Sequence, residues 1–136
     1  MKPRASWLLH QGSPVIEVFL HEPFTGFKVK RTLLADTGAG DQSVTFDLIL
    51  SQSDGAQFAE GAKGLAGASG AIRGRFPVVT LTVEVAPLSV VRLASALIVP
   101  QANIFPTFEG FACFHFLNSF SYGNFGDPHT FSLETR

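Results

Sequence analysis

The chain has 136 residues, a length that fits one domain with a single hydrophobic core. Hydrophobic residues make up 46% of it and charged residues 15%, and the 14 phenylalanines exclude an intrinsically disordered protein. Ten Lys and Arg against eleven Asp and Glu give a net charge of -1, with no basic run that could neutralise a phosphate backbone. We therefore expect one globular domain over residues 1–136 that does not bind nucleic acid.

Nothing in the sequence predicts membrane insertion or secretion. The longest apolar stretch, residues 78–91, is interrupted by Glu84 and Pro87, which leaves it too short for a membrane helix. An early apolar run ends after three residues, too soon for the core of a signal peptide. The single cysteine, Cys113, can form no disulfide within the chain. We expect a cytoplasmic protein without a membrane partner, and an irregular N-terminal segment over residues 1–13.

The first predicted element is a β-hairpin. Residues 14–20 are rich in β-branched side chains, residues 21–26 contain the Pro and Gly of a turn, and residues 27–35 form the returning strand. The returning run alternates at first and then becomes wholly apolar, as a strand does where it passes from the surface into a core. We expect it to deliver Asp36 and the residues after it to the interior.

The rest of the chain predicts a mainly β domain. The polar residues 51–55 indicate a loop, and the glycine-rich tract 61–70 indicates a mobile loop or a hairpin tip. Pro77 is tolerated in a strand only at a sheet edge or a bulge. The remaining elements are strands over 44–50, 72–76, 78–85 and 93–99, a short amphipathic helix over 111–120, and a final strand within 127–134.

The most informative string of the chain is Asp36-Thr37-Gly38, which follows the apolar residues 33–35. An aspartate that ends an apolar strand has its charge in a poorly solvated position, and this costs free energy unless the carboxylate has partners. Asp36 is therefore the main candidate for a catalytic residue. The alternative is a structural role in which Asp36 caps a turn with Thr37 and Gly38.

This string resembles the active-site strand of the retropepsin-like aspartic proteases, in which Asp-Thr-Gly-Ala follows apolar residues. Residues 67–72 are similar to the glycine-rich flap tip of that family, and residues 109–117 resemble its last apolar pair and short helix. The resemblance spans most of residues 15–120 in the expected order. It implies an all-β fold: a closed acid-protease-like barrel lobe with a flap hairpin and one short C-terminal helix.

The resemblance also implies a mechanism. The chain has one Asp-Thr-Gly, so the second catalytic aspartate would come from a second copy, in a homodimer with both Asp36 side chains on its twofold axis. Two close carboxylates share a proton and activate the water that hydrolyses a peptide bond, without a metal or other cofactor. Thr37 would fix the two active-site loops, and Gly38 would let the substrate backbone approach. The residues implied to bind an extended peptide or protein substrate are Ala39, Asp41, Gly67, Ala68, Ser69 and Gly70.

Two departures from the family pattern leave other functions open. Where the family has Gly after the apolar pair, this chain has Cys113, so a larger side chain lies against the catalytic loop. The position before Asp41 is Gly40, which leaves substrate anchoring there open. A second interpretation is therefore a catalytically inactive relative that binds peptides or proteins. A third is a structural β-barrel interaction domain in which Asp36 belongs to a turn.

The histidines predict no metal site. The four lie far apart in the sequence, at positions 10, 21, 115 and 129, without the paired spacing of metal ligands. His115 is two residues from Cys113, which raises the possibility of a Cys-His nucleophilic pair. Two residues at that spacing face different directions on a helix, which disfavours the pair.

Overall fold

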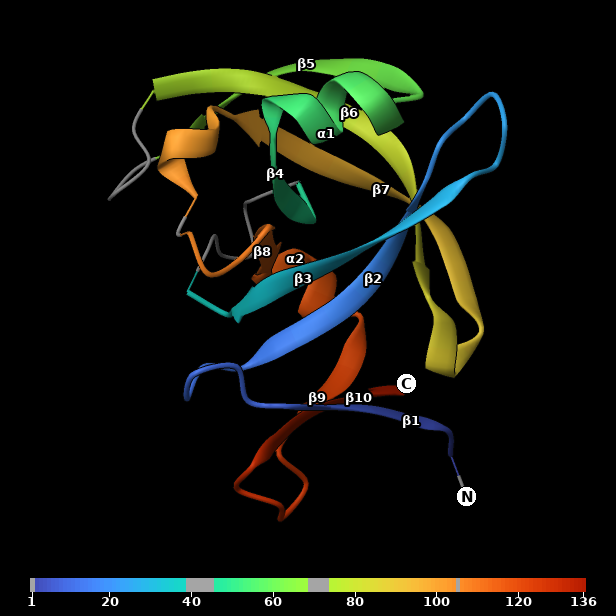
Figure 1. Ribbon diagram of the computed structural model, residues 1–136, viewed down its shortest axis with the longest axis vertical. Coiled ribbons are helices and arrows are strands. Elements are labelled where there is room, and N and C mark those ends of the chain that lie inside the picture. The colour runs from blue at the N-terminus through green and yellow to red at the C-terminus, as the bar shows by residue number, and fades with distance from the viewer. Residues whose placement is uncertain (1, 39–45, 69–73, 105) are drawn as a thin grey trace.

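The computed structural model describes residues 2–38, 46–68, 74–104 and 106–136. Most of the elements are strands, and they are joined by short helices and turns (Figure 1). In chain order they are β1 (Arg4–Leu8), β2 (Val15–His21), β3 (Lys28–Asp36), β4 (Leu48–Ser51), α1 (Gln52–Phe58), β5 (Gly61–Ala68), β6 (Gly74–Val85), the 3-10 helix η1 (Ala86–Leu88), β7 (Val90–Val99), the 3-10 helix η2 (Gln101–Asn103), β8 (Gly110–Cys113), α2 (Phe114–Leu117), β9 (Phe120–Gly123) and β10 (Thr130–Thr135).

Six strands form a closed barrel in the order β2-β3-β8-β4-β7-β6, and β6 closes it by pairing with β2. β5 adds to the outer edge of β6, while β1, β10 and β9 form a separate three-stranded sheet. In Figure 1 this small sheet lies below the barrel and contains both ends of the chain. The predicted all-β fold, with a closed barrel and a short helix near the C-terminus, is confirmed.

The predicted hairpin is present as β2 and β3, which pair antiparallel from Val15 with Leu34 to His21 with Lys28. On β3 the side chains alternate between the two faces of the sheet. Leu33 and Ala35 belong to the main core inside the barrel, whereas Leu34 packs on a second cluster on the outer face. Because Asp36 is two residues after Leu34, its side chain also belongs to the outer face.

The predicted irregular segment over residues 1–13 is wrong, because β1 pairs with β10 along its whole length. Ala5 is buried, and the half-buried Trp7 packs on the core. The Ser6 and Ser132 hydroxyls share a hydrogen bond of 2.7 Å across the pair. The partner strand is more than 120 residues away in the sequence, so no local pattern could reveal this pairing.

The predicted loop over 51–55 is also wrong, because the helix α1 begins there. Its N-cap is Ser51, whose hydroxyl accepts a hydrogen bond from the Asp54 N–H. Phe58 at the end of the helix is fully buried in the main core. The burial of this one aromatic side chain, in a segment that is otherwise polar, explains why the helix forms.

The helix predicted over 111–120 is much shorter than expected. α2 has four residues, and the aromatic residues on either side of it, Phe111 and Phe120, belong to the strands β8 and β9. β8 pairs with β3 on one side and with β4 on the other, so backbone pairing overrides the helical spacing. Phe116 and Leu117 are fully buried, as a core interpretation of the helix requires.

The remaining strands follow the predictions with changed boundaries. The predicted strands on either side of Pro77 are one strand, β6, whose pairing with β7 begins only after Pro77, at Val78. Pro77 therefore has β5 as its one neighbour, which confirms the expected edge position. The glycine-rich tract forms β5, the partner of β6 in a hairpin, and its predicted tip lies outside the described residues. Within the described residues, the strand predicted over 44–50 begins only at Leu48, as β4. β7 is longer than the strand predicted over 93–99, and β10 confirms the predicted final strand.

Candidate active site

Asp36 is the last residue of β3, and its side chain is half-buried. Its Oδ1 accepts a hydrogen bond of 3.0 Å from the Gly38 N–H. A Cβ atom at Gly38 would lie 3.4 Å from the same Oδ1, so the turn is tight against the carboxylate. Thr37 and Gly38 are exposed, so the expectation that the strand delivers the triplet to the interior is wrong. The triplet lies at the rim of the barrel, where a carboxylate remains in contact with solvent.

β8 runs parallel to β3 and places Cys113 directly beside Asp36 in the pairing register. Cys113 is fully buried, and its N–H donates a hydrogen bond of 2.9 Å to the Asp47 carbonyl oxygen. Burial raises the pKa of the Cys113 thiol, and the nearby Asp36 and Asp47 carboxylates raise it further. The thiol is therefore kept neutral, and its bulk occupies the position where the family resemblance places a glycine.

An apolar cluster on the outer face of the barrel surrounds the Asp36 end of β3. Its members come from β4, β6, β7, β8 and the segments next to them, and two partly exposed side chains, Leu34 and Phe76, pack on it. Because Leu34 and Asp36 share one face of β3, the cluster and the carboxylate face the same side. The buried members are Phe46, Ile49, Val78, Leu97, Val99, Ile104, Phe111 and Cys113.

Gly110 makes the close packing of β8 against β4 possible. A Cβ atom at this position would lie 2.5 Å from the Ile49 carbonyl oxygen, closer than side-chain carbons approach a backbone oxygen. It would also lie about 3.0 Å from the Leu50 side chain. Gly110 lies within residues 109–117, which resemble the family's last apolar pair and short helix, and its packing role depends on the neighbouring strand β4.

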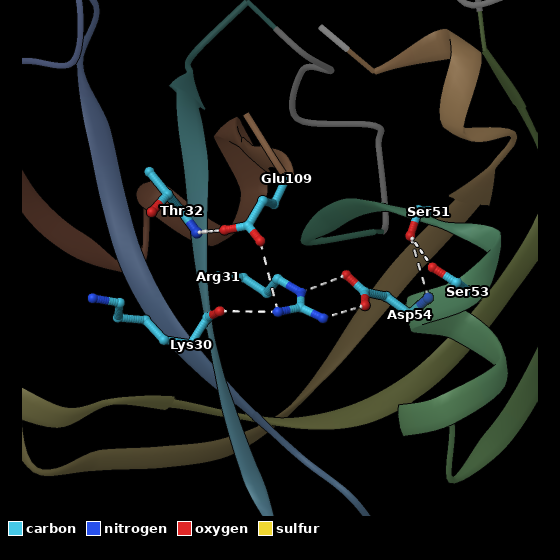
Figure 2. Close-up of polar contacts among 7 residues, drawn as sticks. All are labelled: Lys30, Arg31, Thr32, Ser51, Ser53, Asp54 and Glu109. Carbon is cyan, nitrogen blue, oxygen red and sulfur yellow. Dashed lines mark hydrogen bonds and ion pairs between the residues drawn. The ribbon is translucent and has the colours of Figure 1, made fainter. Parts of the chain in front are cut away.

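A cluster of charged side chains contacts the middle of the same strand, and Figure 2 shows its contacts. The guanidinium of Arg31 on β3 donates two hydrogen bonds of 3.0 Å, one to each carboxylate oxygen of Asp54 on α1. Asp54 is buried, and its hydrogen bond raises the pKa of Arg31. The Glu109 carboxylate accepts a hydrogen bond of 2.9 Å from the Thr32 N–H, and its other oxygen lies 3.6 Å from Nη1 of Arg31. We call Arg31, Asp54 and Glu109 the β3 clamp, because they tie β3 to α1 and to the segment before β8.

Sequence reasoning missed the β3 clamp, although one signal for it was present. Ser51 followed by Asp54 has the spacing of a helix N-cap motif, and this pattern could have predicted α1 and the position of Asp54. Nothing in the sequence indicated that Arg31 is the partner of Asp54. A pairing across 23 residues between a strand and a helix depends on the fold.

The structure brings together only some of the predicted site residues. Asp36, Thr37 and Gly38 form one turn, as their sequence dictates. The backbone of Gly67 and Ala68 belongs to β5, where they pair with residues of β6. In Figure 1 the end of β3 and the start of β6 lie on the same side of the barrel. The other four predicted substrate-binding residues lie outside the described residues: Ala39, Asp41, Ser69 and Gly70.

The arrangement around Cys113 argues against a cysteine nucleophile. His115 lies 3.7 Å from the Asp47 carboxylate and is half-exposed, whereas Cys113 is buried and its pKa is raised. A nucleophilic cysteine needs a lowered pKa and access to substrate. The Asp36 carboxylate is therefore the better candidate for chemistry at this end of the barrel.

Comparisons of the chain with protein-family models, curated proteins and solved structures gave no match. Among the residues that the structure describes, no group of three or more His, Cys, Asp or Glu side chains is placed to hold a metal ion. No helix in the described ranges is long and apolar enough to cross a membrane.

Proposed function

We propose that the chain is an aspartic endopeptidase of the retropepsin-like type, active as a homodimer on extended peptide segments. The observation that carries the proposal is the environment of Asp36. Its carboxylate ends a barrel strand, is half-buried, and is oriented through Oδ1 by the Gly38 N–H. Within the described residues this is its one side-chain hydrogen bond, so Oδ2 has no partner there. A half-buried carboxylate that a backbone N–H orients suits proton transfer better than a structural role.

The proposed reaction needs two such carboxylates, and the chain contributes one Asp-Thr-Gly. In a dimer with twofold symmetry, Asp36 of the partner subunit supplies the other. Two adjacent carboxyl groups cannot both ionise cheaply, so one keeps its proton. The ionised Asp36 takes a proton from a bound water molecule, and the water oxygen attacks the scissile carbonyl carbon. The protonated Asp36 donates its proton to the carbonyl oxygen, which gives a neutral tetrahedral diol that then collapses to acid and amine.

Two further features support a peptide substrate. The outer apolar cluster faces the same side as Asp36, and its partly exposed members, Leu34 and Phe76, offer apolar contacts for side chains next to the scissile bond. The β5–β6 hairpin has the position in the sequence that the family resemblance gives to a flap, and its backbone would bond an extended chain as an added strand does. We therefore expect cleavage between apolar residues.

The proposal is tested by incubating the protein with a diverse peptide mixture between acidic and neutral pH and reading the products by mass spectrometry. We expect cleavage by the wild type that a pepstatin-type inhibitor blocks, and none by Asp36→Asn. Asn has nearly the shape of Asp and still accepts the Gly38 hydrogen bond, so the variant removes charge with little change in structure. Equal cleavage by both proteins would overturn the proposal.

The dimer is tested separately by analytical ultracentrifugation at micromolar concentration, with and without a pepstatin-type inhibitor. We expect a dimer whose population rises with the inhibitor, because a ligand that binds only the dimer stabilises it. A monomer under both conditions would contradict the homodimeric mechanism.

One observation favours a second candidate function, a catalytically inactive peptide-binding domain. Cys113 fills the position beside Asp36 where the family resemblance places a glycine, and it is fully buried there. Its side chain leaves less room for a second active-site loop than a glycine would. The two candidates differ in one measurement: an inactive relative would bind peptides without cleaving them, and Asp36→Asn would leave that binding unchanged.

A further inference from the structure

A pocket of about 400 Å³ is lined by none of the residues of the Asp-Thr-Gly turn, and the proposed reaction does not use it. It lies between the start of β7, the segment before β4, and α2 with the turn that follows it. Its lining is rich in side chains that donate hydrogen bonds or carry charge. The lining residues are Asp47, Arg92, Leu93, His115, Asn118 and Ser119.

The guanidinium of Arg92 is held in place before any ligand arrives. Its Nη2 donates a hydrogen bond of 2.7 Å to the Ser119 hydroxyl, which in turn donates to the Phe116 carbonyl oxygen at 2.6 Å. The Phe116 and Phe120 rings lie 4.6 and 5.0 Å from its central carbon, so the planar group rests on two aromatic side chains. A guanidinium that is already oriented loses little entropy when it binds a ligand.

Within the described residues Arg92 has no carboxylate within ion-pair distance. Partial burial lowers the pKa of Arg92, and the charge of Asp47 opposes this shift to a smaller extent. The Asp47 carboxylate makes its own contacts with other groups. Its Oδ2 accepts a hydrogen bond of 2.9 Å from the Ser95 N–H, and its Oδ1 lies 3.7 Å from His115. The site therefore presents a partly desolvated cation that an anion would stabilise.

Arg136 contacts one of the lining residues. It donates a hydrogen bond of 3.3 Å to Asn118 Oδ1, and another of 3.2 Å to the Phe120 carbonyl oxygen. Because the carboxylate of Asp47 also lines the pocket, a monoanion meets less repulsion there than a dianion.

Leu93 supplies the remaining part of the recognition chemistry. Leu93 also lines the pocket, and it is 60% exposed. We infer that the pocket binds a carboxylate that has an apolar group beside it, as the C-terminal residue of a peptide has. The flat guanidinium of Arg92 pairs with the two oxygens of a carboxylate, and Leu93 contacts the apolar group. This inference does not depend on the proposed protease activity, because none of the pocket residues belongs to the Asp-Thr-Gly turn.

The test is a titration of the isotope-labelled protein followed by amide NMR. The probes are N-acetyl-L-leucine, its neutral amide N-acetyl-L-leucinamide, and inorganic phosphate. We expect saturable shifts of the His115, Asn118 and Ser119 amides with N-acetyl-L-leucine, and binding of the neutral amide at least about tenfold weaker, because charge-assisted hydrogen bonds to the carboxylate are lost. Equal binding of the two leucine probes, tighter binding of phosphate, or no binding of N-acetyl-L-leucine would overturn the inference.

Variants locate the site. Arg92→Gln should weaken N-acetyl-L-leucine binding about tenfold or more, whereas Arg75→Gln, which removes an exposed arginine on β6, should leave it unchanged. Because Arg92 also packs on aromatic rings, two milder variants accompany Arg92→Gln. Arg92→Lys keeps the positive charge but lacks the planar guanidinium group. Ser119→Ala keeps Arg92 but removes the hydroxyl that accepts its hydrogen bond. We expect both to weaken binding with the fold retained. Asp36→Asn should bind the probe as the wild type does, and loss of binding in Asp36→Asn alone would assign the probe to the catalytic cleft and overturn the inference.

Discussion

Two aspartates in contact with the barrel strand β3, one at its middle and one at its end, differ in their burial and their partners. Asp54 is buried, and both of its oxygens accept hydrogen bonds from Arg31. Asp36 is half-buried, and within the described residues it accepts one hydrogen bond, from the Gly38 N–H. Among the described residues, both oxygens of the first carboxylate have partners, whereas only one oxygen of the second has one.

The comparison separates a structural carboxylate from one that is available for chemistry. A buried charge must be paired, because an unpaired one costs several kcal/mol, and a pair as complete as that of Asp54 leaves no oxygen for a substrate. A carboxylate at a solvent-exposed rim pays a smaller desolvation penalty and can exchange protons with water. The β3 clamp holds the strand in place, and Asp36 at its end is positioned as a consequence. The predictions that follow test this division of roles.

The largest effect is expected from Asp36→Asn on hydrolysis. Under the proposed mechanism, loss of the Asp36 carboxylate should lower kcat/KM for any cleaved peptide by about 10³-fold or more, since proton transfer can no longer occur at this position. The free energy of unfolding of the monomer should change by less than about 0.5 kcal/mol, because the Gly38 hydrogen bond is retained. Peptide cleavage and urea unfolding measure the two quantities. A large loss of stability in Asp36→Asn would mean that the carboxylate is structural.

The reverse result is expected for Asp54→Asn. This variant leaves the Arg31 guanidinium with an amide in place of a carboxylate, and we expect the free energy of unfolding to fall by about 3 kcal/mol. Peptide cleavage should persist at temperatures where the variant is folded. Urea unfolding of Asp54→Asn, Arg31→Met and the double variant gives the coupling energy of the pair. A coupling energy under about 0.5 kcal/mol would show that the clamp does not stabilise β3.

The sequence predicted the parts of this comparison that depend on neighbouring residues. The hairpin β2–β3 and the place of Asp36 at the end of an apolar strand follow from local patterns, and both are confirmed. The half-exposed state of Asp36 was not predicted, because an apolar strand can end either inside a core or at its rim. Whether the strand ends in the core or at the rim depends on the strands that pair with it. One of these partners, β8, is about 75 residues further along the chain.

Two elements that were not predicted, β1 and α1, have partners or packing sites that are distant in the sequence. β1 is a strand because β10 pairs with it, and α1 is a helix because Phe58 finds a place in the core. Arg31 appeared as one of several basic residues in an alternating run, with nothing to single it out. Composition and spacing identify candidates for chemistry, whereas the role of each charge is decided by its neighbours in space.

A smaller effect is expected from Gly110→Ala, which tests the packing beneath the site. Its new methyl group would meet the Ile49 carbonyl oxygen at 2.5 Å, and backbone atoms of two paired strands cannot easily move apart. We expect a loss of about 2 kcal/mol or more in the free energy of unfolding. Gly55→Ala is the matched control, because its methyl group would meet only the Ile98 side chain, at 2.9 Å, and a helix gains from alanine. A loss in Gly110→Ala no greater than that in Gly55→Ala would contradict the account of β8.

The smallest effect concerns Cys113, the residue beside Asp36, and it appears only at alkaline pH. Its pKa in the folded protein is raised above the ordinary value of 9.0 by burial and by the Asp36 and Asp47 carboxylates. Below about pH 9 the thiol is neutral in both states, so its contribution to stability is complete. Above that pH the unfolded chain releases the proton while the folded chain keeps it, so stability falls, by about 1 kcal/mol from about pH 9 to about pH 10.

Urea unfolding of the wild type and of Cys113→Ala across this range measures the difference. The variant lacks the thiol, so its stability should fall less steeply with pH, while all other titrating groups remain the same in both proteins. Asp36→Asn removes one of the two carboxylates that raise the thiol pKa, and it should change the slope less than Cys113→Ala does, because burial is the larger cause. Parallel curves for the wild type and Cys113→Ala would mean that the thiol ionises in the folded protein. The side chain beside Asp36 would then be open to solvent, and the Asp36 end of β3 would be less well packed than the middle of the strand, where the β3 clamp binds.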